Sequence, residues 1–198
     1  MRVLVACEFS GIVREAFRKR GHDAWSCDLL PTEIPGQHIQ GDVLEHLEDG
    51  WDLMIAHPPC TYLCTMSNCR IKESGRLEKR EDALRFFTTL ADAAIPKVAV
   101  ENPRGYPERH YRPADQIIEP FQFGHPASKK TCLWLRGLPL LAPTKIVEPD
   151  RRWDGRRWRQ WVDFGEHGWG ARKSHNTSRT FPGIADAMAQ QWAGPAGD

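Results

Sequence analysis

The sequence has no long apolar run. None of its apolar segments approaches the roughly 20 consecutive residues that a membrane-spanning helix needs. The first residues, Met1–Ala6, also lack the long apolar segment and the small-residue cleavage site of a signal peptide. These absences argue against a membrane protein and against a secreted one, so we expect a cytoplasmic protein.

The sequence also has little net charge. Its 27 Lys and Arg residues and 26 Asp and Glu residues leave a formal net charge of +1, which by itself identifies no partner. Apolar residues make up 40% of the chain and charged residues 27%, a balance typical of soluble globular proteins. We therefore expect one domain with a core of its own, or one domain with an appendage.

Paired C-x-x-C cysteines are absent, as are internal repeats and low-complexity tracts. Three of the six cysteines, Cys60, Cys64 and Cys69, lie close together, but their spacing differs from that of a zinc site and no second pair follows. A chain of this length does not need disulfides to stabilise its core. We predict no metal site.

The apolar residues that are present indicate alternating strands and helices. Arg2–Cys7 is a short apolar run typical of a buried strand, and Ala24–Cys27 is a second one. Between them, apolar residues share one face of a helix that starts after Ser10, a plausible N-cap, and stops at Gly21. Arg14 falls away from that apolar face. This order predicts the start of a parallel sheet in an α/β fold.

The rest of the chain continues this alternation. Further strands are expected at Trp51–Ala56, Lys97–Val100 and Thr131–Leu135, and helices at Leu77–Ala94 and Ile184–Trp192. The segment Thr61–Arg76 has little periodicity and is expected to form a mobile loop.

One segment departs from this pattern. From Arg151 to Arg179 there are eight Lys and Arg residues and three Asp and Glu residues, a local net charge of +5, with four tryptophans among them. Arginines can pair with phosphates and tryptophans can stack on bases, so this small basic, Trp-rich insertion is a candidate nucleic-acid contact, with Arg157 and Trp158 as candidate residues. Alternatively, it is a surface hairpin whose tryptophans pack on the main domain.

The ends of the first two predicted strands carry residues that suit a nucleoside cofactor. The first strand ends on Glu8-Phe9-Ser10-Gly11, where Gly11 would let a ligand approach the backbone, although a tight structural turn is at least as plausible. Asp28 ends the second strand and could accept hydrogen bonds from ribose hydroxyls, with Asp42 as a further candidate. Either aspartate could instead be an ordinary turn residue.

The ends of the next two strands carry a candidate nucleophile and a candidate acid. Cys60 follows two prolines in His57-Pro58-Pro59-Cys60, and a thiolate is a good nucleophile, although a buried structural cysteine is the common alternative. Glu101 follows the neighbouring strand and could face the same cleft, unless it is a capping or ion-paired residue. A thiolate beside a carboxylic acid suits addition to a heteroaromatic ring, because the acid can hydrogen-bond a ring nitrogen.

In this order, the motifs resemble those of the DNA cytosine-C5 methyltransferases, especially the short, divergent members found in phage and prophage genomes. Pro58-Pro59-Cys60 is similar to the nucleophile motif of that family, and Glu101-Asn102 is similar to the motif that engages the cytosine. The remaining similarities are to the first cofactor motif, the ribose and adenine positions, the basic motif and the small-residue helix that returns to the cofactor: Phe9-Ser10-Gly11, Asp28, Asp42, Ser128-Lys129-Lys130 and Gly183–Ala189.

The resemblance implies a fold, a cofactor and a reaction. The fold would be a Rossmann-like sheet of an S-adenosylmethionine (SAM)-dependent methyltransferase, with helices on both faces. Cys60 would add to C6 of a cytosine in DNA while Glu101 assists at N3, C5 would take the methyl group from SAM, and loss of the C5 proton would release Cys60. The target base would be flipped out of the duplex, and the loop Thr61–Arg76 would close over it.

The resemblance also assigns the candidate site residues and the domain organisation. Glu8, Phe9, Ser10, Gly11, Asp28, Asp42 and Pro58 would bind the cofactor, while Asn102, Lys129, Lys130, Arg157 and Trp158 would bind the substrate. The catalytic core would span residues 1–140, a reduced target-recognition insertion 141–175, and a C-terminal helix returning to the core 176–198.

The sequence departs from the family pattern in several places. His57 stands where a small residue is usual, Pro103 stands where an aliphatic residue is common, and lysines replace an arginine in the basic motif. The target-recognition region is much shorter than in the family. Two alternatives therefore remain open: the same chemistry on a free deoxycytidine nucleotide, and a SAM- or DNA-binding module without catalysis.

Overall fold

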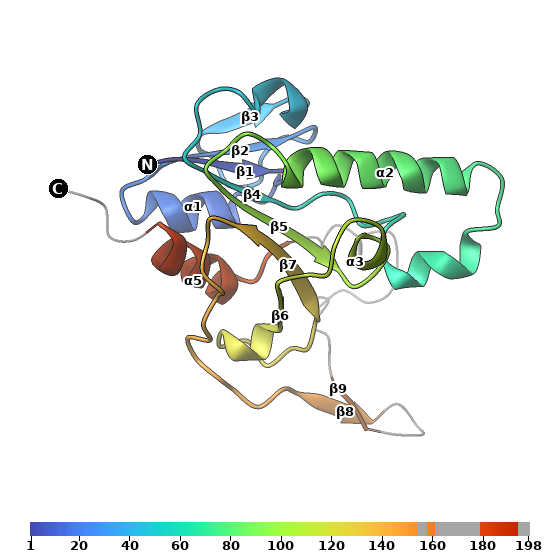
Figure 1. Ribbon diagram of the computed structural model, residues 1–198. Coiled ribbons are helices and arrows are strands. Elements are labelled where there is room, and N and C mark those ends of the chain that lie inside the picture. Colours follow the sequence, from blue (N-terminus) through green and yellow to red (C-terminus); the bar gives the residue numbers. More distant parts are fainter. Residues whose placement is uncertain (154–157, 161–178, 194–198) are drawn as a thin grey trace.

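The structure of the protein is a computed structural model that describes residues 1–153, 158–160 and 179–193. Strands and helices alternate along most of the chain, with short 3-10 helices (η) in the connections (Figure 1). In chain order the elements are β1 (Arg2–Ala6), α1 (Ile12–Arg18), β2 (Asp23–Asp28), β3 (His38–Gln40), η1 (Val43–His46), β4 (Leu53–Ala56), η2 (Thr65–Arg70), α2 (Arg76–Ala91), β5 (Lys97–Pro103), α3 (Pro107–His110), β6 (Gln116–Ile118), η3 (Pro120–Gln122), β7 (Thr131–Arg136), β8 (Arg151–Trp153), β9 (Trp158–Gln160) and α5 (Pro182–Trp192).

Seven strands form one sheet in the order β3-β2-β1-β4-β5-β7-β6. The first five strands in this order run parallel to their neighbours, whereas β7 is antiparallel to both β5 and β6. The predicted α/β fold with a parallel first half is confirmed. In this arrangement the carboxyl ends of β1, β2, β4 and β5 meet at one edge of the sheet, where ligands bind in open α/β folds.

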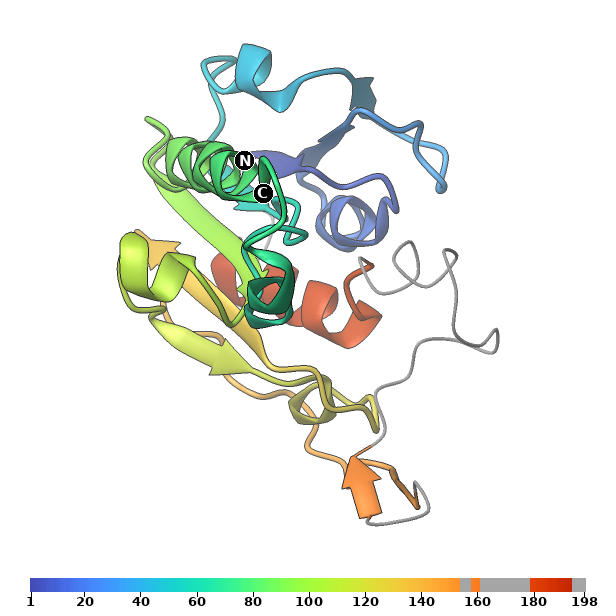
Figure 2. The ribbon, with the colours of Figure 1, turned by 90° about the vertical axis from the view of Figure 1, so that its right-hand side faces the viewer.

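The apolar core has two layers, one on each face of the sheet. Successive strand residues point to opposite faces, so Val5 and Ile55 pack against α1 and α5, while Leu4 and Met54 pack against α2. The end-on view shows α2 on one side of the strands and α1 and α5 on the other (Figure 2). The expected helices on both faces are therefore present. None of the helices in the described part of the chain is long and apolar enough to cross a membrane.

The first helix differs from its prediction in two respects. Its N-cap is Gly11, in the left-handed conformation with φ of 76°, rather than Ser10. Arg14 is fully buried, although its helical position suggested exposure, because its guanidinium donates to Ser26 Oγ at 3.0 Å and to the carbonyl of Ile34 at 2.5 Å. Arg14 thus ties α1 to β2 and to the connection between β2 and β3.

The segment after Cys60 contains more regular structure than the aperiodic sequence indicated. Thr65–Arg70 forms η2 within the segment expected to be a mobile loop, and the mobility of this segment remains a prediction. The segment is attached to α2 through Arg80, which is buried and donates to the carbonyl of Tyr62 at 2.9 Å and to Ser67 Oγ at 2.8 Å.

The basic, Trp-rich insertion is described only in part. Its strands β8 and β9 form an antiparallel pair in which Trp153 lies opposite Trp158. Arg157 lies outside the described residues, and only the backbone of Trp158 is described. The division of the chain at residues 140 and 175 remains a prediction.

Candidate active site

A hydrogen bond joins His57, which directly follows β4, to Glu101, which lies within β5 because that strand continues to Pro103 instead of ending at Val100 as predicted. Parallel pairing of Ala56 with Val100 brings the next residues of the two strands side by side on the face that α1 and α5 cover. His57 Nδ1 lies 3.1 Å from Glu101 Oε2, and the His57 side chain is only 7% exposed. His57, the residue that departs from the family pattern, therefore contacts the candidate acid directly.

This pair fixes the charge state of Glu101. Burial alone would raise the pKa of the Glu101 carboxyl, but the hydrogen bond from His57 and the charges of Lys129 and His57 outweigh it, so the pKa lies below its ordinary value. Glu101 is consequently ionised in the free protein at neutral pH. To donate a hydrogen bond to a ring nitrogen, it must first gain a proton from the substrate or its surroundings.

Asn102, the residue after Glu101, contacts the turn that carries Cys60. Asn102 is buried and its Nδ2 donates to the carbonyl of Pro58 at 2.8 Å. The chain then turns, with the backbone amides of Leu63 and Cys64 both donating to the carbonyl of Cys60 at 3.0 Å. Asn102 thus links the Pro-Pro turn to β5, and its contact with the substrate remains a prediction.

The Cys60 thiol is half-buried and interacts with several neighbours. A hydrogen bond with Cys64, burial and the negative charge of Glu101 raise the pKa of the Cys60 thiol well above its ordinary value, and only Lys129 acts in the opposite direction. The thiol is therefore protonated at neutral pH in the free protein, and an additional positive charge would be needed to form the thiolate.

Lys129 connects the candidate acid to the end of α5. Together with Glu101, Thr131 and Arg179 it lines a small cavity that is closed by Phe181 and Ile184. Because its charge lowers the pKa of both Glu101 and Cys60, Lys129 lies within electrostatic reach of the two candidate catalytic residues. Lys130 next to it is exposed.

A second cavity, of about 210 Å³, lies at the ends of β1 and β2 beside the Cys60 turn. Asp28 and Asp42 both line it, and so does Pro59, the residue before Cys60. One oxygen of each aspartate accepts a backbone amide, from Leu30 at 2.9 Å and from Leu44 at 3.0 Å, which fixes the two carboxylates in place. The walls between them are mostly apolar: Cys7, Cys27, Leu29, Val43 and Phe86.

This cavity suits a nucleoside with a positive charge. Burial together with the charges of Asp28 and Asp42 raises the pKa of Cys27 to about 11, so both carboxylates act on the enclosed space. Their second oxygens can accept hydrogen bonds from hydroxyl or amino groups of a ligand. The cavity is smaller than the roughly 300–1,000 Å³ of typical ligand pockets, and Pro59, the neighbour of Cys60, lies in its wall.

The first turn has a structural role in addition to any contact with a cofactor. Both carboxylate oxygens of Glu8 accept amides from the start of α1, Val13 N at 2.7 Å and Arg14 N at 3.2 Å. A Cβ atom on Gly11 would lie 2.7 Å from the Arg14 guanidinium, so this position requires glycine. Phe9 and Ser10 are buried. The alternative of a tight structural turn is therefore supported, and cofactor contacts from this turn remain a prediction.

The structure brings several of the predicted site residues together at one edge of the sheet. Cys60, Glu101 and Lys129 are in mutual electrostatic contact, and Asp28 and Asp42 share the neighbouring cavity. The sequence interpretation missed Cys64 as a partner of Cys60, and Pro59 rather than Pro58 lines the cavity. The signal that could have identified Cys64 as this partner is its spacing of four residues from Cys60, across a turn.

Comparison with known proteins gives a fold neighbour and no family. The sequence matches no protein-family profile and no curated protein sequence. The fold is similar to the crystal structure of a prophage-encoded E. coli protein described as a candidate DNA modification methyltransferase, with a TM-score of 0.50 and 14% sequence identity over 75% of this chain. The chain spans about half of that protein, 52% of its length. The chain therefore has the Rossmann-like fold found in that protein.

Proposed function

We propose that the chain transfers a methyl group from SAM to C5 of a cytosine in DNA, through a covalent adduct with Cys60. The observation that carries this proposal is that Cys60, Glu101 and Lys129 interact electrostatically next to a cavity that is lined by the carboxylates of Asp28 and Asp42. The fold neighbour, described as a candidate DNA modification methyltransferase, supports the same class of reaction.

Each residue of the site has a role in this reaction. The thiolate of Cys60 adds to C6 of the cytosine, and Glu101, once protonated, hydrogen-bonds N3 so that the ring can accept the electron pair. C5 then takes the methyl group, a base removes the C5 proton, and the bond between Cys60 and C6 breaks to restore the aromatic ring. His57 holds Glu101 in place, and Asn102 holds the Cys60 turn.

The proposed cofactor fits the charges of the site. When bound, SAM supplies an electrophilic methyl group and a sulfonium charge. Asp28 and Asp42 would hold its nucleoside part, and Pro59 would lie between it and Cys60. A positive charge close to Cys60 lowers the pKa of the thiol, which opposes the effects of Cys64 and Glu101 in the free protein.

The raised pKa of Cys60 also favours a second candidate function, a SAM- or DNA-binding module without catalysis. A protonated thiol is a poor nucleophile. If no bound ligand lowers the pKa of Cys60, the chain would bind SAM and DNA without transferring a methyl group.

Mass spectrometry of nucleosides from treated DNA separates the two functions. The purified protein is incubated with SAM and unmethylated duplex DNA, which is then digested and analysed for 5-methyldeoxycytidine. We expect this nucleoside with the wild-type protein and none with Cys60→Ala. A wild-type protein that binds SAM and DNA but yields no 5-methyldeoxycytidine would contradict the proposed function and leave the binding module.

A parallel reaction on free deoxycytidine nucleotides tests the choice of substrate. We expect methylation of the duplex only. Methylation of the free nucleotide at a comparable rate would show that DNA is not the required substrate.

A further inference from the structure

A polar groove of about 690 Å³ lies next to the Cys60 turn, between η2 and α3. It is separate from the cavities around Asp28 and around Lys129. Three arginines line it, Arg80, Arg104 and Arg109, together with Tyr106, His110 and one acidic residue, Glu108. With His110 neutral, these three positive charges and one negative charge leave the lining at +2.

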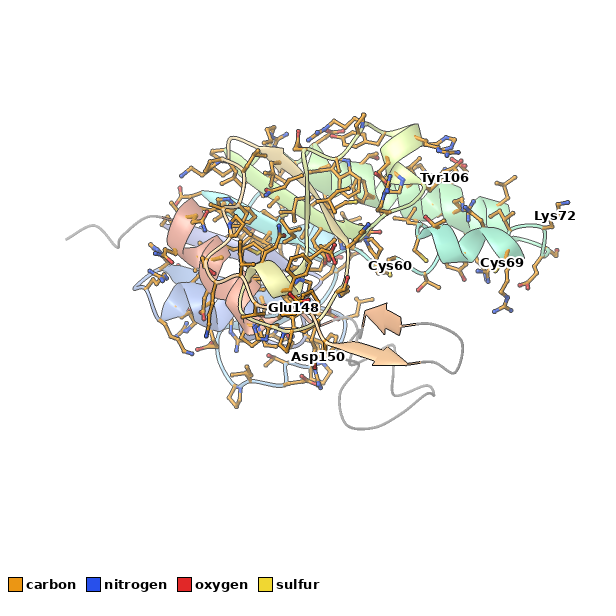
Figure 3. All side chains as sticks on the ribbon, turned by 90° about the horizontal axis from the view of Figure 1, so that it is seen from below. Cys60, Cys69, Lys72, Tyr106, Glu148 and Asp150 are labelled. Carbon is orange, nitrogen blue, oxygen red and sulfur yellow. The ribbon has the colours of Figure 1, made fainter. Side chains whose placement is uncertain are left out.

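The groove is built onto the same turn as Cys60. Tyr106 N donates to the carbonyl of Leu63 at 2.7 Å, and Thr65 donates to the carbonyl of Arg104 through both its amide, at 3.1 Å, and its hydroxyl, at 2.9 Å. Cys64 and Gly105 form an antiparallel bridge, and a Cβ atom on Gly105 would lie 2.0 Å from the Leu63 carbonyl. The groove therefore starts within a few residues of Cys60 and keeps a fixed relation to it; Figure 3 shows Cys60 and Tyr106 on the same side of the molecule.

The floor of the groove is rigid, and its outer arginines are accessible. Arg80 is buried, and its guanidinium lies 4.9 Å from the Tyr106 ring, whose hydroxyl donates to Glu81 at 2.6 Å. Arg104 is 58% exposed and pairs with Glu108 at 3.5 Å, its one acidic partner among the described residues. Arg109 is exposed and forms no ion pair within the described part of the chain.

The groove also carries an aromatic platform. The rings of Tyr106 and His110 stack with their centroids 3.7 Å apart and an interplanar angle of 19°. His110 is exposed, so a flat group can approach its ring from the solvent. Exposed aromatic rings next to arginines are the combination with which proteins hold unpaired nucleic acid strands, by stacking on bases and pairing with phosphates.

We propose that this groove binds the nucleic acid strand next to the nucleotide that Cys60 attacks. Arg104 and Arg109 pair with its phosphates, and the ring of His110, supported by Tyr106, stacks on a neighbouring base. This inference rests on the proposed function for the identity of the target, and it adds a strand-binding site outside the basic insertion. A base attacked by Cys60 must leave the helix, and the groove contacts the turn after Cys60, so it can hold the flanking backbone.

Fluorescence anisotropy with a labelled duplex, at several salt concentrations, tests the pairing with phosphates. Removal of one arginine–phosphate pair reduces the slope of log affinity against log salt by about 1. For Arg104→Ala/Arg109→Ala we expect a slope smaller by about 2 and an affinity at low salt that is weaker by about tenfold or more. Arg20→Ala, which removes an exposed charge at the end of α1, is the control and should change the slope by less than about 1.

Substitution of His110 tests the stacking interaction. Removal of one base–aromatic stack costs about 1–3 kcal/mol, or roughly five- to 150-fold in affinity. We expect a decrease in this range for His110→Ala and most of the affinity to return in His110→Phe, which keeps a flat ring.

The outcomes separate this inference from the proposed function. An unchanged salt slope and affinity in the double arginine variant, with SAM binding retained, would overturn the groove even if the wild-type protein makes 5-methyldeoxycytidine. Equal decreases in affinity for His110→Ala and His110→Phe would overturn the stacking interaction. If the wild-type protein makes no 5-methyldeoxycytidine but its DNA affinity depends on Arg104, Arg109 and a ring at position 110 as stated, the groove stands and the methyltransferase proposal fails.

Discussion

The chemistry of Cys60 depends on the residues that surround its thiol. Cys64 and Glu101 favour the protonated form, whereas Lys129 favours the thiolate. In the free protein, this balance keeps the Cys60 thiol protonated and therefore weakly reactive. The balance can be changed one residue at a time.

Replacement of Cys64 by Ala should make Cys60 more reactive. The hydrogen bond with Cys64 is the largest factor that raises the pKa of Cys60, so its removal lowers that pKa. We expect the pH dependence of Cys60 alkylation by iodoacetamide, followed by peptide mass spectrometry, to move to lower pH by about one unit or more. Cys69, which is exposed and in the same digest, provides the internal control. No movement of the midpoint would show that the two thiols do not interact.

Replacement of His57 by Ala should raise the pKa of Glu101. Burial then acts on the carboxyl without the hydrogen bond that opposes it. A depressed pKa in the folded state contributes stability above the unfolded pKa, and this stability disappears as the pH falls through the folded pKa. Urea denaturation should therefore show a destabilisation of about 2 kcal/mol at neutral pH that shrinks below the ordinary glutamate value of 4.5.

His57→Gln provides the control for that measurement. A Gln amide can still donate to Glu101, so this variant should recover part of the stability and keep the acidic limb of the methylation pH profile close to that of the wild type. Equal behaviour of His57→Ala and the wild-type protein in both measurements would contradict a role of His57 in positioning Glu101.

At the scale of the elements, residues at the ends of β1 and β2 line the proposed cofactor cavity. Removal of a hydrogen bond to a charged group costs about 1.5–3 kcal/mol, so Asp28→Ala and Asp42→Ala should each weaken SAM binding roughly ten- to 100-fold in isothermal titration calorimetry. Asp82→Ala, on the exposed surface of α2, should leave the affinity unchanged. If both Asp28→Ala and Asp42→Ala bound SAM with the wild-type affinity, this cavity would not be the cofactor site.

The attachment of α1 to the sheet depends on Arg14. The buried guanidinium holds the β2–β3 connection through bonds to Thr32, Ile34 and Ser26. Arg14→Ala leaves those groups unsatisfied, so we expect a decrease of about 3–5 kcal/mol in the free energy of unfolding. Arg18→Ala, one turn later and partly exposed, should cost less than about 1 kcal/mol. Similar small decreases in both variants would contradict the buried role of Arg14.

The sequence predicts the central elements well and the edges of the sheet poorly. Apolar runs locate β1, β4 and β5 because strands buried on both faces are nearly continuous in apolar residues. The three-residue strands β3 and β6 have no such signal, since each is short and partly exposed. The antiparallel direction of β7 and the burial of Arg14 result from contacts between segments that are distant in the sequence. The periodicity of apolar residues within one segment cannot predict such contacts.

The candidate site was predictable where a residue type and a strand end coincide. Cys60, Asp28 and Asp42 each lie at or after the end of a strand, whereas Glu101 lies within β5, two residues before its end, and parallel strands bring their carboxyl ends to one edge. The role of Cys64 had only its four-residue spacing from Cys60 as a signal. The groove around Tyr106 was not predictable, because it depends on how the chain after Cys60 crosses the chain after Glu101, which no local pattern indicates.

At the scale of the whole molecule, charge is distributed unevenly. The net charge is +1, but residues 151–179 carry a local net charge of +5. We propose that residues 141–175 form a reduced target-recognition insertion between the catalytic core, 1–140, and a C-terminal helix region, 176–198. Replacement of residues 151–178 by a short Gly-Ser linker should then reduce the salt dependence of DNA affinity while SAM binding is retained.

The central claim is that Cys60 attacks a cytosine. Its most direct test is intact-mass spectrometry of the protein after incubation with SAM and a duplex that contains 5-fluorocytosine, because fluorine at C5 prevents release of the thiol. We predict a covalent adduct equal to protein plus DNA strand plus one methyl group, mapped by digestion to Cys60 and missing in Cys60→Ala. Full binding of SAM and DNA without any adduct, or an adduct at another cysteine, would contradict this account.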